Sequence, residues 1–148
     1  MSTTRSFTPA AYDEVLTVTA VVYGVIPLIV DLSPTHVLHP AWSPHARFHV
    51  VWQISMGSMI AWIVVLLAWW PGANRAGRLR LAGVLGCAVL GGFVVAALTR
   101  NLYGGAFSEP GGVPPVNGID ANVLAFTPTI IIQLIALALA LSLPAKTS

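Results

Sequence analysis

Charged residues are scarce in this sequence. Asp, Glu, Lys and Arg make up 8% of the 148 residues, and 56% are hydrophobic, whereas about 25% of a typical soluble domain is charged. The composition excludes an ordinary soluble fold and predicts an integral membrane protein. The net charge of +2 is too small and too scattered for nucleic-acid binding, so we expect no nucleic-acid partner.

Cysteine is nearly absent as well. Cys87 is the only one and lies inside an apolar run, so an intrachain disulfide is impossible and we interpret Cys87 as a small membrane-embedded residue. The opening segment has one arginine, and no small-residue cleavage site follows the first apolar run. We therefore expect no cleaved signal peptide.

Four long apolar runs cover about residues 12–31, 48–70, 81–99 and 123–143, and a helix of about 20 residues crosses a membrane. Pro27 is expected to bend the first span, with neighbouring helices satisfying the freed carbonyl, and the fourth span tolerates Pro128. The segment 101–122 is rich in Gly and Pro and is expected to be a long loop. We predict a single all-α domain over residues 1–148, an integral membrane four-helix bundle.

An even number of spans places both termini on one side of the membrane. Arg75, Arg78 and Arg80 lie between spans two and three with no acid beside them, which predicts that this side is cytoplasmic. The two long loops, 31–47 and 101–122, must then share the opposite face. We expect residues from both loops to build one pocket there.

The segment 31–53 concentrates the ionisable groups: it holds all four histidines, Asp31 and Arg47. Such groups near a membrane are costly and indicate a functional site. If a helix begins at Ser43 and Pro44, with serine as the cap, then His45 and His49 lie on one face. Trp52, Gln53 and Met56 would continue this face as a pocket wall, whereas Arg47, about 200° away, would meet the loop, a lipid phosphate or a carboxylate.

Metal binding is an open alternative. The pairs His36-x-x-His39 and His45-x-x-x-His49 can together supply four nitrogens, and histidines four apart are a known zinc spacing. There is no cysteine nearby, no H-E-x-x-H pattern, and a proline-rich connection between the pairs. A haem held between helices would need histidines on other spans, and spans three and four have none. We therefore expect no cofactor and no metal, and keep zinc as an alternative.

Residues 35–49, THVLHPAWSPHARFH, resemble a signature, T-H-x-x-N-P-x-W-x-P-H-A-R-F-H, of a group of small four-span membrane proteins. Some members look like the membrane epoxide hydrolases of fungal polyketide pathways, and this resemblance implies epoxide hydrolysis. His39 replaces the group's asparagine, which puts in doubt any role that needs an amide there. The four-helix plan with a polar pocket near one face is also similar to the emopamil-binding protein family of sterol isomerases, without its acidic motif.

We expect an enzyme that uses acid–base chemistry on a lipophilic small molecule, by epoxide hydrolysis or a related ring opening or isomerisation. Asp31 would be the base or nucleophile, and His45 and His49 the acid or water-positioning groups. His36 would orient them, and Arg47 would keep the carboxylate ionised. Further substrate-binding candidates are His39, Trp42, Trp52, Gln53, Met56, Asn101, Tyr103, Glu109 and Asp120.

Other interpretations remain open. The histidines and tryptophans can simply be interfacial residues, with their polar ends at the membrane surface. A lipid-binding or transport-related module would use the same pocket without chemistry. The expected partners are a lipophilic substrate and membrane lipid, with a homo-oligomer or a structural role in a larger complex as alternatives.

Overall fold

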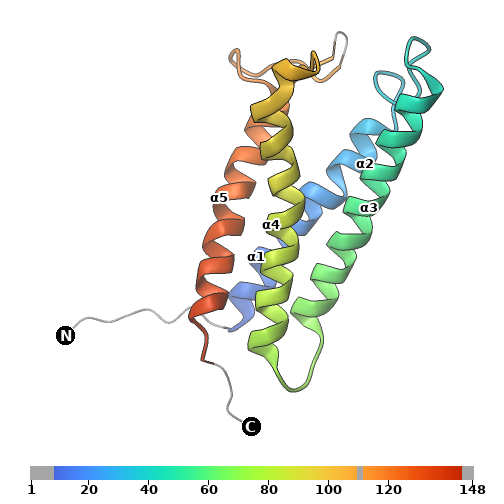
Figure 1. Cartoon of the computed structure of the whole chain (residues 1–148). Helices are drawn as coiled ribbons and strands as arrows, with labels where there is room; N and C mark the ends of the chain where they lie inside the picture. The colour runs from blue at the N-terminus through green and yellow to red at the C-terminus, as the bar shows by residue number, and fades with distance from the viewer. Residues whose placement is uncertain (1–8, 110–111, 145–148) are drawn as a thin grey trace.

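The computed structural model describes residues 9–109 and 112–144 and is an all-α four-helix bundle (Figure 1). Its helices are α1 (Pro9–Gly24), α2 (Ile26–Asp31), α3 (Pro44–Trp69), α4 (Arg75–Thr99) and α5 (Ala121–Ser142), and a short 3₁₀ turn, η1 (Arg100–Leu102), follows α4. With α1 and α2 taken as one span, four helices are long and apolar enough to cross a membrane. The expected four-span architecture is confirmed.

The first span is broken where proline predicted a bend. α1 ends at Gly24, and Pro27 lies in the first turn of α2. The backbone stays helical across the break, because the Val25 amide bonds to the Val21 carbonyl at 2.9 Å. Ser58 of α3 donates to the Gly24 carbonyl at 2.6 Å, next to the carbonyl that Pro27 leaves free. A neighbouring helix thus supplies a hydrogen bond at the break, to the carbonyl beside the one that Pro27 frees.

Local caps set the start of α3 and α4. Ser43 accepts a hydrogen bond from the Ala46 amide at 3.2 Å and Pro44 opens α3, which confirms the serine cap. Asn74, in the left-handed region at φ 58°, accepts from the Gly77 amide. This cap makes α4 begin at Arg75 rather than near residue 81, so the three arginines lie on its first turns.

The two ends of the bundle differ in packing. We call the half with the start of α1, the α3–α4 turn and the end of α5 the closed end, and the other half, with α2 and the loops 32–43 and 103–120, the loop end (Figure 1). The buried residues of α3, α4 and α5 run from Ile54, Leu90 and Thr129 toward the closed end. α2 packs against α1 and α3 but not against α4 or α5, so the helix pairs separate toward the loop end.

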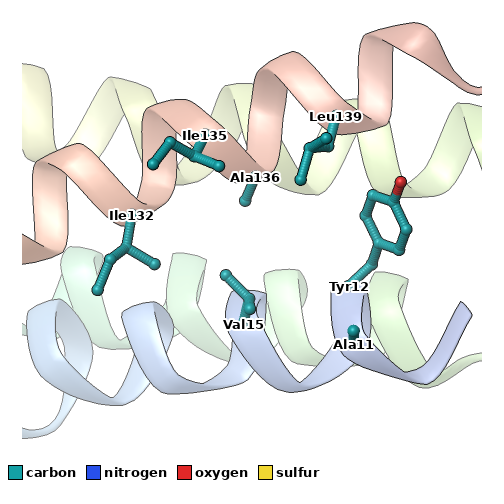
Figure 2. A pocket seen from close by; sticks show the side chains of 7 residues that line it. All are labelled: Ala11, Tyr12, Val15, Ile132, Ile135, Ala136 and Leu139. Atoms are coloured by element: carbon teal, nitrogen blue, oxygen red, sulfur yellow. The ribbon is translucent and has the colours of Figure 1, made fainter. Parts of the chain in front are cut away.

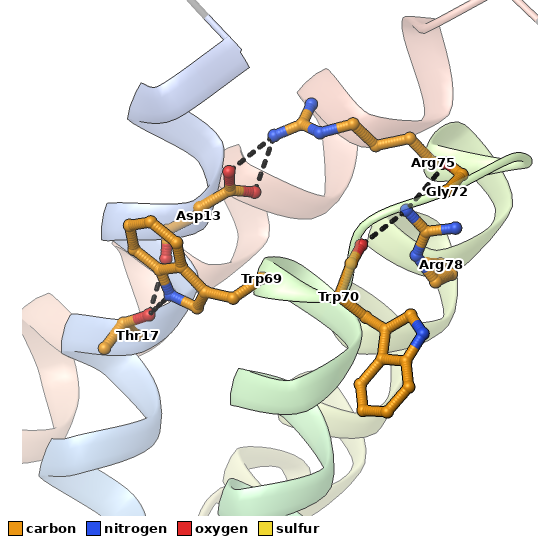
Figure 3. A network of polar contacts seen from close by, with 7 residues as sticks. All are labelled: Asp13, Thr17, Trp69, Trp70, Gly72, Arg75 and Arg78. Atoms are coloured by element: carbon orange, nitrogen blue, oxygen red, sulfur yellow. Dashed lines mark hydrogen bonds and ion pairs between the residues drawn. The ribbon is translucent and has the colours of Figure 1, made fainter.

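Each of the three arginines at the closed end has a structural partner, as Figure 3 shows for two of them. Arg75 binds both carboxylate oxygens of Asp13, at 2.6 and 2.7 Å. Arg78 donates to the Trp70 carbonyl at the end of α3, and Arg80 to the Ala140 carbonyl near the end of α5. The premise that no acid opposes these arginines is wrong for Arg75, which pairs with Asp13. Arg78 and Arg80 lie against helix C-termini instead. The cytoplasmic side stays a prediction.

Candidate functional site

His36 lies where the two long loops meet. Its Nδ1 is 2.9 Å from the hydroxyl of Thr35, and its ring meets that of Trp42 edge-on, with centroids 6.0 Å apart. A Cβ added to Gly112 of the other loop would lie 3.7 Å from Cε1 of His36. Two loops that are far apart in the sequence therefore touch at this imidazole, which confirms that they share one end.

Two acids belong to the segments that meet near His36. Asp31, the last residue of α2, is half-buried and lies five residues before His36 in the chain. The Asp31 carbonyl accepts from the Val37 amide at 3.0 Å, which folds the loop back over the helix end. Glu109 also lies next to Gly112: its Cβ would be 3.5 Å from the Cβ added to Gly112. We call Asp31, His36 and Glu109 the loop junction.

Arg47 shapes the loop instead of pairing with a carboxylate. Its Nη2 donates to the carbonyls of His39 and Pro40 at 2.8 and 3.3 Å, while its Nε is buried without a hydrogen-bond partner. Among residues 9–109 and 112–144 the ion pair that forms is Arg75–Asp13. The contact with the loop is confirmed, but the role of holding Asp31 ionised is wrong, because the guanidinium is occupied by carbonyls.

His45 and His49 share a face, as their spacing predicted, with their Nε2 atoms 3.0 Å apart. Their ring contacts are with each other, Phe48 and Trp52. The prediction that this face forms a pocket wall is wrong, because its side chains lie on the outer surface of α3. Trp52 is 57% and Met56 47% exposed, and Gln53 is exposed too. In a membrane this face meets lipid or another chain.

The other candidates are spread around the loop end. Nδ1 of His39 accepts from the Ala41 amide at 3.3 Å, and the Tyr103 hydroxyl donates to the Ala96 carbonyl at 2.7 Å. Asn101 is exposed, and Asp120 precedes α5 at the cap position without a side-chain cap bond. In the part of the chain that the structure describes, no three His, Cys, Asp or Glu side chains could hold a metal together. The two histidine pairs therefore do not converge into one zinc site within the chain.

Sequence reasoning missed a polar cluster in the middle of the bundle. Gln133 of α5 is 1% exposed; it accepts from the Thr19 hydroxyl at 2.6 Å and donates to the Gly83 carbonyl at 2.9 Å. A Cβ on Gly86 would lie 2.5 Å from its Nε2, so glycine there makes room for the amide. The signal was available, because Gln133 is the lone polar residue in the run IIIQLIALALAL.

Two hollows lie between helices, away from the loop junction. One of about 180 Å³ separates α1 from α5, and its wall includes Tyr12, Val15, Ile132 and Leu139 (Figure 2). Another of about 220 Å³ lies between α4 and α5, beside Cys87 and Gln133. Both walls are almost entirely apolar, which suits a hydrocarbon chain better than a polar ligand.

The model of a family of unknown function, DUF6640, matches residues 15–143. The chain belongs to the DUF6640 family. The match spans the four membrane helices and both loops, so the loop junction of this DUF6640 protein lies inside the region that defines the family. No curated protein and no solved structure matches the chain. The resemblance to membrane epoxide hydrolases therefore stays a prediction.

Proposed function

We propose that this DUF6640 protein is a membrane enzyme that acts on a lipophilic small molecule by acid–base catalysis at the loop junction, with hydrolysis of an epoxide to a diol as the reaction. The observation that supports it is that Asp31 and His36 lie close together where the two loops meet: the Asp31 carbonyl accepts from the amide of Val37, next to His36 in the chain, and His36 approaches Gly112 of the second loop. An acid and a base placed together at the end of an apolar bundle cost free energy, and function is the default reason for keeping them.

The reaction needs one proton donor and one proton acceptor. His36 in its protonated form donates a proton to the epoxide oxygen as the carbon–oxygen bond breaks, and Asp31 accepts a proton from the water that attacks the carbon. Transfer of that proton from Asp31 back to His36 restores both groups. The net change is one water added per epoxide opened, with no cofactor consumed.

The neighbouring residues have supporting roles in this proposal. Thr35 occupies Nδ1 of His36, which leaves Nε2 for the substrate. Glu109 lies beside Gly112, where the second loop approaches His36, and Arg47 holds the shape of the first loop through two carbonyls. His45 and His49 have no part in the reaction, because they lie on the outer face of α3.

The test is incubation of the purified protein with a panel of long-chain epoxides in ¹⁸O-labelled water, followed by mass spectrometry of the diol. Asp31→Asn and His36→Ala should each lower turnover by about a hundredfold or more. His45→Ala is the matched control, a histidine removed from the same end but outside the junction, and should keep turnover. Conversion of no epoxide, or full activity in Asp31→Asn, would contradict the proposal.

The hollow between α1 and α5 supports a second candidate, a lipid-binding module without catalysis. Ile132 lines this hollow, whereas the adjacent Ile131 does not, although both side chains are exposed. Native mass spectrometry should then show a bound lipid that is lost in Ile132→Trp and kept in Ile131→Trp. Equal lipid retention in both variants would exclude the hollow as the binding site, whatever the outcome of the epoxide assay.

A further inference from the structure

His45 and His49 form a side-chain pair that the proposed reaction does not use. Their Nε2 atoms lie 3.0 Å apart and their ring centroids 4.4 Å apart. Both side chains are exposed near the start of α3. We propose that this pair chelates a divalent transition-metal ion, Zn²⁺, Cu²⁺ or Ni²⁺, at a site separate from the loop junction.

The distance between the two nitrogens suits a shared ion. Two nitrogen ligands at about 2.0–2.1 Å from a tetrahedral zinc are about 3.3–3.4 Å apart, so the rings need to open by only a few tenths of an ångström from their present separation. The start of α3 holds the pair in place, because the Ser43 cap and Pro44 fix the first turn. Histidines four apart on a helix then project from the same side.

The ligand chemistry selects the class of ion. Neutral imidazole suits zinc, copper and nickel, whereas magnesium and calcium prefer oxygen ligands. The other two histidines are engaged elsewhere: His36 with Thr35, and His39 with the Ala41 amide. Within residues 9–109 and 112–144 no third His, Cys, Asp or Glu joins the pair in a metal-binding group. Water, or the same pair from a second copy standing parallel in the membrane, completes the coordination.

The experiment is titration of tag-free protein in detergent with Zn²⁺, followed by calorimetry and by metal analysis after dialysis. We expect a single class of zinc site, with affinity at least tenfold weaker in His45→Ala and in His49→Ala but unchanged in His39→Ala. One ion per chain would mean that water completes the site, and one ion per two chains would mean that a second copy does. Both stoichiometries support chelation by the pair.

A double variant moves one histidine to another face of the helix and keeps the number of histidines constant. His49→Ala combined with Val51→His places the second imidazole about 120° away from His45 around the helix, on an exposed position. Zinc affinity should fall as in His49→Ala, and the nitrogen hyperfine pattern of bound Cu²⁺ should lose one imidazole. Unchanged zinc affinity in this folded variant, or no binding by the parent protein, would overturn the proposal. Neither result depends on epoxide turnover.

Discussion

The closed end and the loop end of this bundle are built from similar apolar helices, but they are held together in different ways. Toward the closed end a small residue lets helices touch, because a Cβ on Gly83 would lie 2.9 Å from the Leu137 side chain; near the middle of the bundle a Cβ on Gly24 would lie 2.3 Å from Cβ of Ala61. At the loop end α2 contacts neither α4 nor α5. Close packing gives stability to one end, and the separation at the other leaves the ionisable groups accessible.

Within the loop end, each helix pair is tied by its own contacts. Phe93 of α4 stacks on Phe126 of α5 with centroids 4.6 Å apart, and the Arg100 guanidinium lies 4.7 Å from the ring centroid of Phe107. On the other side, Arg47 ties α3 to the loop that follows α2. His36 and Gly112 bridge the two pairs. Function is therefore expected where the scaffold is least tightly packed.

The largest expected effect is a difference in cysteine labelling, because the two ends should lie on opposite sides of the membrane. In a Cys87→Ala background, a cysteine at Ala73 lies in the α3–α4 turn and one at Val113 in the second loop. An impermeant thiol reagent added outside intact cells should label Val113→Cys and leave Ala73→Cys unlabelled. Labelling of both from outside would contradict a common face for the two loops, and the reverse pattern would invert the predicted orientation.

A glycine-to-alanine pair tests the difference in packing. Gly24→Ala should destabilise the protein by about 1–3 kcal/mol, because the added methyl overlaps Ala61. Gly92→Ala at the loop end meets no atom within 4 Å and should stabilise it by about 0.5–1 kcal/mol through helix propensity. Unfolding midpoints in a mixed-detergent titration measure both changes. Equal effects would mean that the loop end packs as closely as the middle of the bundle, where Gly24 meets Ala61.

The ion pair at the closed end should contribute a smaller amount. Asp13→Asn removes the charge that faces Arg75 and should lower the free energy of unfolding by about 1 kcal/mol. Glu14→Gln alters the adjacent, exposed acid and should change it by less than about 0.5 kcal/mol. The same unfolding titration checks this, and a null result in Asp13→Asn would remove the pair from the contacts that hold α1 to α4.

The smallest effect is expected on the outer face of α3. Met56→Trp should alter both stability and turnover little, within about 0.5 kcal/mol, because Met56 is exposed away from the bundle. Gly57→Leu, one residue along, places a large side chain against α1, where Gly57 is buried, and should destabilise the protein clearly. A loss of turnover in well-folded Met56→Trp would instead support the original prediction that this face forms a pocket wall.

The local parts of the site could be predicted because their causes are local. Serine followed by proline fixes the start of α3, and the 3.6-residue repeat then puts His45 and His49 together and Arg47 on the other side. The contact between the loops followed from an even number of spans, which needs only hydropathy. Gln133 was also readable in principle, as a lone polar residue in an apolar run.

The sequence by itself determined four spans, all-α architecture and a common end for the two loops, because apolar runs of this length leave the chain few alternatives in a membrane. Tertiary structure alone decided that the face of α3 carrying Trp52 points outward, that Asp13 meets Arg75 and that Arg47 binds carbonyls rather than Asp31. A span that is apolar all round carries no signal for its inner face. That choice depends on small residues and polar partners on other helices, whose distance along the chain hides them from any local pattern.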